Sequence, residues 1–209
     1  LKDEDTRALD DLVTRRRQLI AMRVQETLRL GSAGSRPLQK SLKSHIAWLD
    51  KRISDIDVDL TQRLRSSDVW RTKDDLLRSI PGVGAVTSLT LLAKCPELGQ
   101  INRREIAKLA GVAPLANDSG KHRGKRFIWG GRADVRAVLY MATVSAIRCN
   151  PAIKAFAARL KHTGKPAKVI IAACMRKLLS TAFHYEFHVE KQCALASLKR
   201  LTWNTVALP

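Results

Sequence analysis

The strongest constraint on the fold is a regular spacing of apolar residues between positions 42 and 64. Neighbouring members of this series lie three or four residues apart, which is the heptad pattern of helices that pack as a coiled coil. The pattern predicts a long helix that begins near Pro37 and buries one apolar stripe against a partner helix. The stripe comprises Leu42, Ile46, Leu49, Ile53, Ile56, Leu60 and Leu64.

The residues that precede this helix supply its partner. Residues 1–30 have helical composition and apolar spacing, and the Gly-Ser-Ala-Gly-Ser segment at 31–35 predicts a turn. We therefore predict an antiparallel coiled-coil hairpin over residues 1–66. It could protrude and join copies of the chain into a homo-oligomer, or it could be an ordinary two-helix packing unit. The apolar residues of the first helix are Leu9, Val13, Ile20, Val24 and Leu28.

The rest of the chain predicts a second helical domain over residues 67–186, so the expected class is all-α. Asn102 with Glu105 forms a capping-box pattern, and Asn150 before Pro151 marks another helix start. Residues 112–131, called the serine loop below, are rich in glycine and basic residues and lack periodicity. They predict an irregular or hairpin loop. No structure is predicted for the tail at 187–209.

The charge of the chain indicates a polyanionic partner. Its 209 residues carry a net charge of +19, with +4 on residues 1–66 and +15 on residues 67–209. A basic excess of this size favours a nucleic acid, and it places most of the binding surface in the second domain.

Other features of the composition exclude several classes of protein. The four cysteines lie far apart without Cys-x-x-Cys spacing, so neither a zinc site nor a disulfide framework is indicated. No apolar run reaches the length of about 20 residues that spans a bilayer, and no signal peptide is recognisable. We expect a cytoplasmic protein without a membrane partner. Because the chain begins without Met and in helical register, we interpret it as a fragment.

A glycine-containing turn near residue 82 resembles a helix-hairpin-helix motif over residues 69–94. Glycines in such a turn expose backbone N–H groups at a helix start, and these donors suit a phosphate without reading base identity. A tight structural turn between packed helices is the alternative. The predicted phosphate contacts are Gly82, Gly84, Ala85 and Thr87.

The serine loop places a small hydroxyl among cations. Ser119 is a weak nucleophile by itself, but neighbouring Lys and Arg side chains can neutralise a phosphodiester and stabilise charge that develops at phosphorus. A Ser-Gly turn in a basic loop, without chemistry, fits the same residues. The cations predicted to contact DNA here are Lys121, Arg123, Lys125, Arg126, Arg132 and Arg136.

Three smaller patterns have structural alternatives. His184 and His188 share a helical spacing but lack a third ligand, so a metal site is not favoured. Asp118 and Asp134 are better explained as turn or helix caps than as a carboxylate pair. Phe127 and Trp129 suit stacking on a base or burial against the helices equally well.

Residues 80–179 resemble the C-terminal domain of an insertion-sequence transposase family. The resemblance rests on the segments IPGVGAVTSLTLLAKCPELG, IAKLAGVAPLANDSGKHRGKR and IWGGRADVRAVLYMATVSAIRCNPAIKAF. It implies that Ser119, in the Ser-Gly element that follows Gly111-Val112-Ala113-Pro114, is a catalytic nucleophile. The resemblance fades after about residue 179.

The same family implies parts that this chain lacks. Its members pair the serine domain with an N-terminal ribonuclease-H-like domain that holds Mg²⁺ on four carboxylates, through a coiled coil. It also implies a structured guide RNA and assembly of several protomers. We therefore predict a DNA transposase in which Ser119 forms a phosphoserine intermediate, with this fragment inactive alone. The alternatives are a non-catalytic helix-hairpin-helix DNA-binding module, a degenerate transposase remnant and a basic RNA-binding scaffold.

Overall fold

The computed structural model describes residues 4–124 and 126–184. Helices predominate in these residues, which confirms the predicted all-α class. The chain divides into two compact units, Leu1–Arg71 and Thr72–Pro209. The tail at 187–209 lies outside the described residues.

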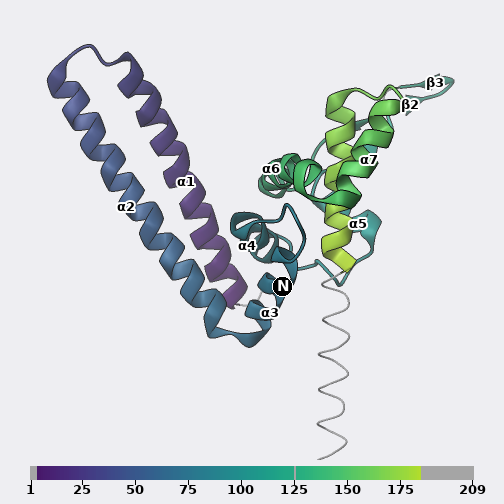
Figure 1. The fold of residues 1–209 in the computed structure, drawn as a ribbon, viewed down its shortest axis with the longest axis horizontal. Coiled ribbons are helices and arrows are strands. Elements are labelled where there is room, and N and C mark those ends of the chain that lie inside the picture. Colours follow the sequence, from purple (N-terminus) through teal and green to yellow (C-terminus); the bar gives the residue numbers. More distant parts are fainter. Residues whose placement is uncertain (1–3, 125, 185–209) are drawn as a thin grey trace, which may run out of the picture. The chain divides into compact units, whose positions relative to one another are not determined.

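The first unit is formed by α1 (Glu4–Ser32) and α2 (Arg36–Ser66), which run alongside one another in opposite directions (Figure 1). Their contact buries one apolar stripe from each helix, as the heptad spacing of α2 requires. The most deeply buried members are Leu9, Val13 and Leu19 of α1 with Leu42, Leu49, Leu60 and Leu64 of α2.

Ion pairs across the hairpin fix its register. Arg16 donates to Asp57 with an Nε–Oδ1 distance of 2.5 Å, and Arg23 donates to Asp50 over 3.0 Å. A step of seven residues forward along α1 is thus matched by a step of seven residues back along α2. This relation holds only for antiparallel helices in one register, so the charged pairs and the apolar stripe specify the same alignment.

The hairpin differs from the prediction near its turn. Gly31 and Ser32 belong to α1, so the turn is shorter than predicted. Val24 and Leu28, predicted to be in the stripe, are 48% and 71% exposed. At the turn end of the hairpin, a polar contact takes the place of the apolar one. The buried Glu26 accepts from Arg29 over 2.9 Å and lies 3.5 Å from His45 Nδ1.

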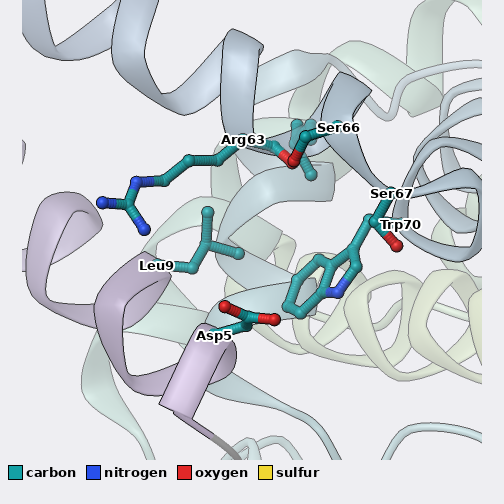
Figure 2. A pocket seen from close by; sticks show the side chains of 7 residues that line it. Asp5, Leu9, Arg63, Ser66, Ser67 and Trp70 are labelled. Atoms are coloured by element: carbon teal, nitrogen blue, oxygen red, sulfur yellow. The ribbon is translucent and has the colours of Figure 1, made fainter.

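A small pocket lies where the start of α1 meets the end of α2. Figure 2 shows Leu9 between the Arg63 side chain and the indole of Trp70. Its volume of about 90 Å³ is far below that of pockets that enclose drug-sized molecules, so we assign no ligand to it. Its lining is Asp5, Leu9, Arg63, Leu64, Ser66, Ser67 and Trp70.

The second unit is a helical domain around one apolar core. It takes in most of α3 (Asp68–Arg78), then α4 (Ala85–Lys94), α5 (Arg103–Leu109), α6 (Ala133–Cys149), α7 (Pro151–His162) and a helical segment at residues 167–184. Helix α6 packs against both α4 and α7. The fully buried side chains include Leu77, Leu91, Ile106, Val112, Val135, Leu139, Ile153, Leu178 and Leu179.

Two helix starts form as the sequence predicts. The Asn102 side chain accepts from the backbone of Arg104 and Glu105, and Glu105 accepts from the Asn102 backbone, which completes a capping box. Asn150 accepts from Ala152 N and Ile153 N at the start of α7. These caps satisfy donors that have no partner within the helix.

The serine loop forms two nested pairs of very short antiparallel strands. The inner pair is β2 (Asp118–Ser119) with β3 (His122–Arg123), and the outer pair is β1 (Pro114–Leu115) with β4 (Phe127–Ile128). They make a narrow arm, labelled at its tip by β2 and β3 in Figure 1. These short strands agree with the irregular or hairpin loop predicted for residues 112–131.

None of the described helices combines the length and the apolar character needed to cross a membrane.

Candidate nucleic-acid interface and serine loop

The turn between α3 and α4 is held against the following helices. Gly82 has a φ of 102°, and a Cβ at this position would lie 2.5 Å from Ala146 Cβ on α6. Asn150 Nδ2 also donates to Pro81 O over 3.2 Å, which ties the turn to the start of α7. Only glycine combines this backbone angle with so close an approach, so Gly82 has a structural role.

The other end of this turn is open. Gly84 is the N-cap of α4, and a Cβ added there would meet nothing within 4 Å. Gly84 and Ala85 are exposed, and the first N–H groups of a helix have no partner within it. This end of α4 is therefore accessible for the phosphate contact predicted from the sequence. Thr87 is 7% exposed, so it offers little surface for the contact predicted from the sequence.

A buried hydrogen bond that sequence analysis missed joins α3 to α4. Ser88 Oγ donates to Asp74 Oδ1 over 2.6 Å, and Arg78 Nη1 lies 3.5 Å from the other carboxylate oxygen. Both Asp74 and Ser88 are buried. Because a buried polar group requires a partner, we interpret this hydrogen bond as one that holds α3 and α4 together on either side of the turn.

Ser119 lies at the tip of the serine loop. It is paired with His122 across a two-residue turn, in which Gly120 has a φ of 54°. Ser119, Gly120 and Lys121 are all exposed. The hydroxyl is therefore presented to solvent on a narrow arm with Lys121 two residues away, where a nucleic-acid backbone has access to it.

The strand register separates some of the predicted cations from Ser119. Asp118 is paired with Arg123, and side chains of directly opposed residues lie on the same face of a strand pair. Arg123 therefore lies beside Asp118, on the face opposite that of Ser119. Arg126 is exposed, and Lys125 lies outside the described residues.

Arg132 anchors the base of the serine loop. Its guanidinium donates twice to Glu97, each over 2.6 Å, and once to Lys94 O over 2.6 Å. The hydrogen bond to Glu97 raises the pKa of Arg132 above its ordinary value. These bonds to residues near the end of α4 give Arg132 an architectural role, with which the predicted phosphate contact would compete.

Arg136 and Gly131 complete the base of the loop. Arg136 Nη1 donates to Gly130 O over 2.5 Å, and Arg132 N donates to Leu109 O over 2.7 Å. A Cβ on Gly131 would collide with the backbone N of Gly111. The two ends of the loop are thus packed together, while its tip is exposed.

The structure decides between the two interpretations of the aromatic residues. Phe127 and Trp129 are 60% and 69% exposed, so neither ring is buried against the helices. Their exposure beside the cations of the loop leaves both rings available to stack on a base or sugar.

The carboxylates and histidines of the described residues form no metal centre. No group of three or more potential ligands occurs among them, and Asp134 lies 3.9 Å from Lys94 Nζ in the first turn of α6. His188, one half of the predicted pair with His184, lies outside the described residues.

Comparison with known proteins supports a relationship to transposases. Residues 74–158, which contain the α3–α4 turn, the serine loop and α6, match the model of the IS116/IS110/IS902 transposase family. A pilin gene-inverting protein of Moraxella bovis and another of Moraxella lacunata are each 30% identical over 140 residues, 65% of this chain and 43% of theirs. An uncharacterised protein of insertion element IS116 from Streptomyces clavuligerus is 28% identical over 133 residues, 61% of this chain and 31% of its own.

The aligned regions therefore span less than half the length of these relatives. Over this part of the chain, the comparisons show similarity to proteins of that transposase family.

Proposed function

We propose that this chain is the DNA-handling and nucleophile-bearing part of a DNA transposase. The observation that carries the proposal is the exposed Ser119 at the tip of a basic arm, within the residues that match the transposase family. The relatives' names refer to gene inversion and to an insertion element, which favours recombination over a non-catalytic DNA-binding module.

The proposed reaction is a transesterification at phosphorus. Ser119 Oγ attacks a phosphodiester, a P–Oγ bond forms, and the bond from phosphorus to one strand oxygen breaks. The hydroxyl proton passes to a base, and the departing oxygen takes up a proton. A hydroxyl of a second strand then attacks the phosphoserine in the reverse sense, so no external energy source is required. Lys121, with its exposed turn position, is placed to offset the charge that develops.

A serine nucleophile needs an activator. A serine hydroxyl is almost entirely protonated at neutral pH, and the described residues around Ser119 offer cations rather than a metal-binding cluster. We propose that Mg²⁺, held by the carboxylates of a ribonuclease-H-like domain of a longer protein, supplies Lewis acidity. That domain, a guide RNA and a homo-oligomer formed through α1 and α2 are what the family resemblance implies.

The test is a covalent adduct. The chain joined to the ribonuclease-H-like domain is incubated with labelled DNA and Mg²⁺, denatured, and examined for a shifted protein band. We expect an adduct that maps to Ser119 by peptide mass and is abolished by Ser119→Ala. The 209-residue chain alone should bind DNA without forming it.

Two results would overturn the proposal. An adduct that persists in the Ser119→Ala protein would assign the nucleophile to another residue, such as Tyr140. An adduct formed by the 209-residue chain alone would remove the need for a composite site. Ser180→Ala is the matched control, since it removes a hydroxyl that donates to Arg176 O within its own helix.

A further inference from the structure

A stretch without acidic residues follows the serine loop. Residues 135–184 contain nine Lys and Arg and no Asp or Glu. Seven of these cations lie on α7, on the turn after it and on the helical residues 167–184, and all seven are exposed. They are Lys154, Arg159, Lys161, Lys165, Lys168, Arg176 and Lys177. We call α7, the turn and residues 167–184 the cationic helix pair.

Two of these cations meet over one aromatic ring. The guanidinium of Arg159 lies 5.2 Å from the centroid of the Phe156 ring, and Lys177 Nζ lies 4.7 Å from it. Arg159 belongs to α7 and Lys177 to the following helix, so the ring brings like charges from both helices together. Each cation is attracted by the ring, but the two charges repel one another.

No carboxylate offsets that repulsion within the described residues. None of the seven cations forms an ion pair with a described part of the chain. Arg16 and Arg23 of the hairpin and Arg132 show the opposite arrangement, since each faces a carboxylate. A local concentration of unneutralised charge attracts an external anion with several charges.

We propose that the cationic helix pair binds the phosphate backbone of a DNA duplex, as a surface additional to the serine loop and the α3–α4 turn. The proposal rests on the proposed function for its choice of DNA, on which a transposase acts. It assigns the helix pair to holding the duplex and leaves the strand chemistry to the serine loop.

The chemistry of the surface favours a duplex over a single strand. Single strands are held by exposed aromatic rings on which bases stack, and Phe156 is half-buried with its ring engaged by two cations. The serine loop, with its exposed Phe127 and Trp129, differs in this respect. Lys and Arg alone contact phosphates without identifying bases, so the binding should be independent of sequence.

The size of the surface also fits a duplex backbone. The 12 residues of α7 and the 18 residues at 167–184 correspond to helices about 18 and 27 Å long. Exposed Ala155 and Ala158 on α7 add little bulk between the cations. Helices of these lengths are long enough to span several phosphates of a duplex backbone.

The test uses the 209-residue chain and reversible binding. Arg159→Gln with Lys177→Gln is compared with Lys40→Gln with Lys43→Gln, which makes the same charge change at exposed positions of α2. Affinity is measured against salt for a random-sequence DNA duplex, its single strand and an RNA duplex of the same length. We expect the first variant to make the log–log slope for the DNA duplex shallower by about 2, and the second to leave it nearly unchanged.

The affinity for the DNA duplex should also fall by more than about tenfold at low salt in the first variant, and fall less for the single strand. Phe156→Leu should lower it by a smaller factor, because the cations remain but lose the ring that positions them. Arg159→Lys with Lys177→Arg keeps both charges, so this variant should bind the duplex nearly as tightly as the parent. A loss of affinity in this variant would indicate misfolding rather than loss of charge.

The proposal is overturned if the two double Gln variants lose the same affinity, if neither loses any, or if the largest loss is for the RNA duplex. This outcome is independent of the proposed reaction. Failure to detect an adduct at Ser119 would count against the phosphoserine mechanism and would leave duplex binding by the helix pair intact.

Discussion

The arginines of the helical hairpin and the cations of the second unit have different surroundings. Arg16 and Arg23 of α1 each face an aspartate of α2, and these pairs lie in register with the apolar stripe. The seven cations of α7 and residues 167–184 face solvent without such partners among the described residues. In the hairpin, charge specifies how the chain folds, whereas on the helix pair it remains available to a partner.

Arg132 shows that the surroundings of a residue matter more than its place in the sequence. It lies in the second unit, close in sequence to the cations of the serine loop, but it is bound to Glu97 as Arg16 and Arg23 are bound to aspartates. Net charge therefore indicates the class of partner, and only the contacts of each cation indicate which of them meet it.

The largest effect is expected at the tip of the serine loop. In a protein that includes the proposed metal-binding domain, Lys121→Ala should slow strand cleavage by more than about a hundredfold, because a preorganised cation beside the reacting phosphate stabilises the transition state. Binding of DNA should change little. Arg123→Ala is the comparison, and its smaller effect on cleavage follows from its place beside Asp118. Equal losses of binding and cleavage in Lys121→Ala would make the loop a simple electrostatic contact.

Gly82→Ala should have the next largest effect, on the free energy of unfolding. The new Cβ would meet Ala146 at 2.5 Å while φ is 102°, so we expect a loss of about 3 kcal/mol in a urea titration. Gly84→Ala, in open space, should lose less than about 1 kcal/mol. Similar losses at both positions would show that the turn is not packed against α6 as described.

Glu97→Gln tests whether Arg132 is architectural. Loss of the charged partner should lower stability by about 1 kcal/mol, since both side chains are partly exposed. It should also accelerate proteolysis within residues 112–131, because the amide keeps only one acceptor oxygen and the base of the loop loses one of these two charge-assisted hydrogen bonds. Unchanged stability together with unchanged proteolysis would contradict this role.

Asp57→Asn should have the smallest effect. Its partner Arg16 is partly buried and Asp57 is about half exposed, so a loss of about 0.5–1 kcal/mol in stability is expected. The salt dependence of DNA binding should not change. Asp59→Asn, an exposed neighbour in the same helix, is the control and should leave both quantities unchanged. If Asp57→Asn alters DNA binding more than stability, the hairpin charges also serve a partner.

The features that the sequence predicted well depend on residues close together in the chain. The α2 heptads and the caps at Asn102 and Asn150 follow from spacing and local hydrogen bonding, and the structure contains them. The predicted end of α1 was less accurate, because the helix continues through Gly31, where helix propensity favoured a turn. The exposure of Val24 and Leu28 follows from the polar group at Glu26, which no periodicity indicates.

The candidate site was harder to predict because its geometry depends on distant residues. Arg132 and Glu97 are 35 positions apart, and Asn150 and Pro81 are 69 apart. Ser119 was proposed as the nucleophile from its motif. The strand register that separates it from Arg123 is a property of the folded arm. The cationic helix pair had a signal in the sequence, namely the absence of Asp and Glu from residues 135–184.

The most direct test of the contrast between the two units is the salt dependence of DNA affinity for the 209-residue chain. If about six phosphates are contacted, log affinity should fall with log salt concentration with a slope of about −5. Neutralising Arg16 and Arg23 together should leave that slope unchanged, and neutralising Arg159 and Lys177 should reduce it. A flat salt dependence, or a slope set by the hairpin arginines, would contradict the proposal that the cationic helix pair binds DNA.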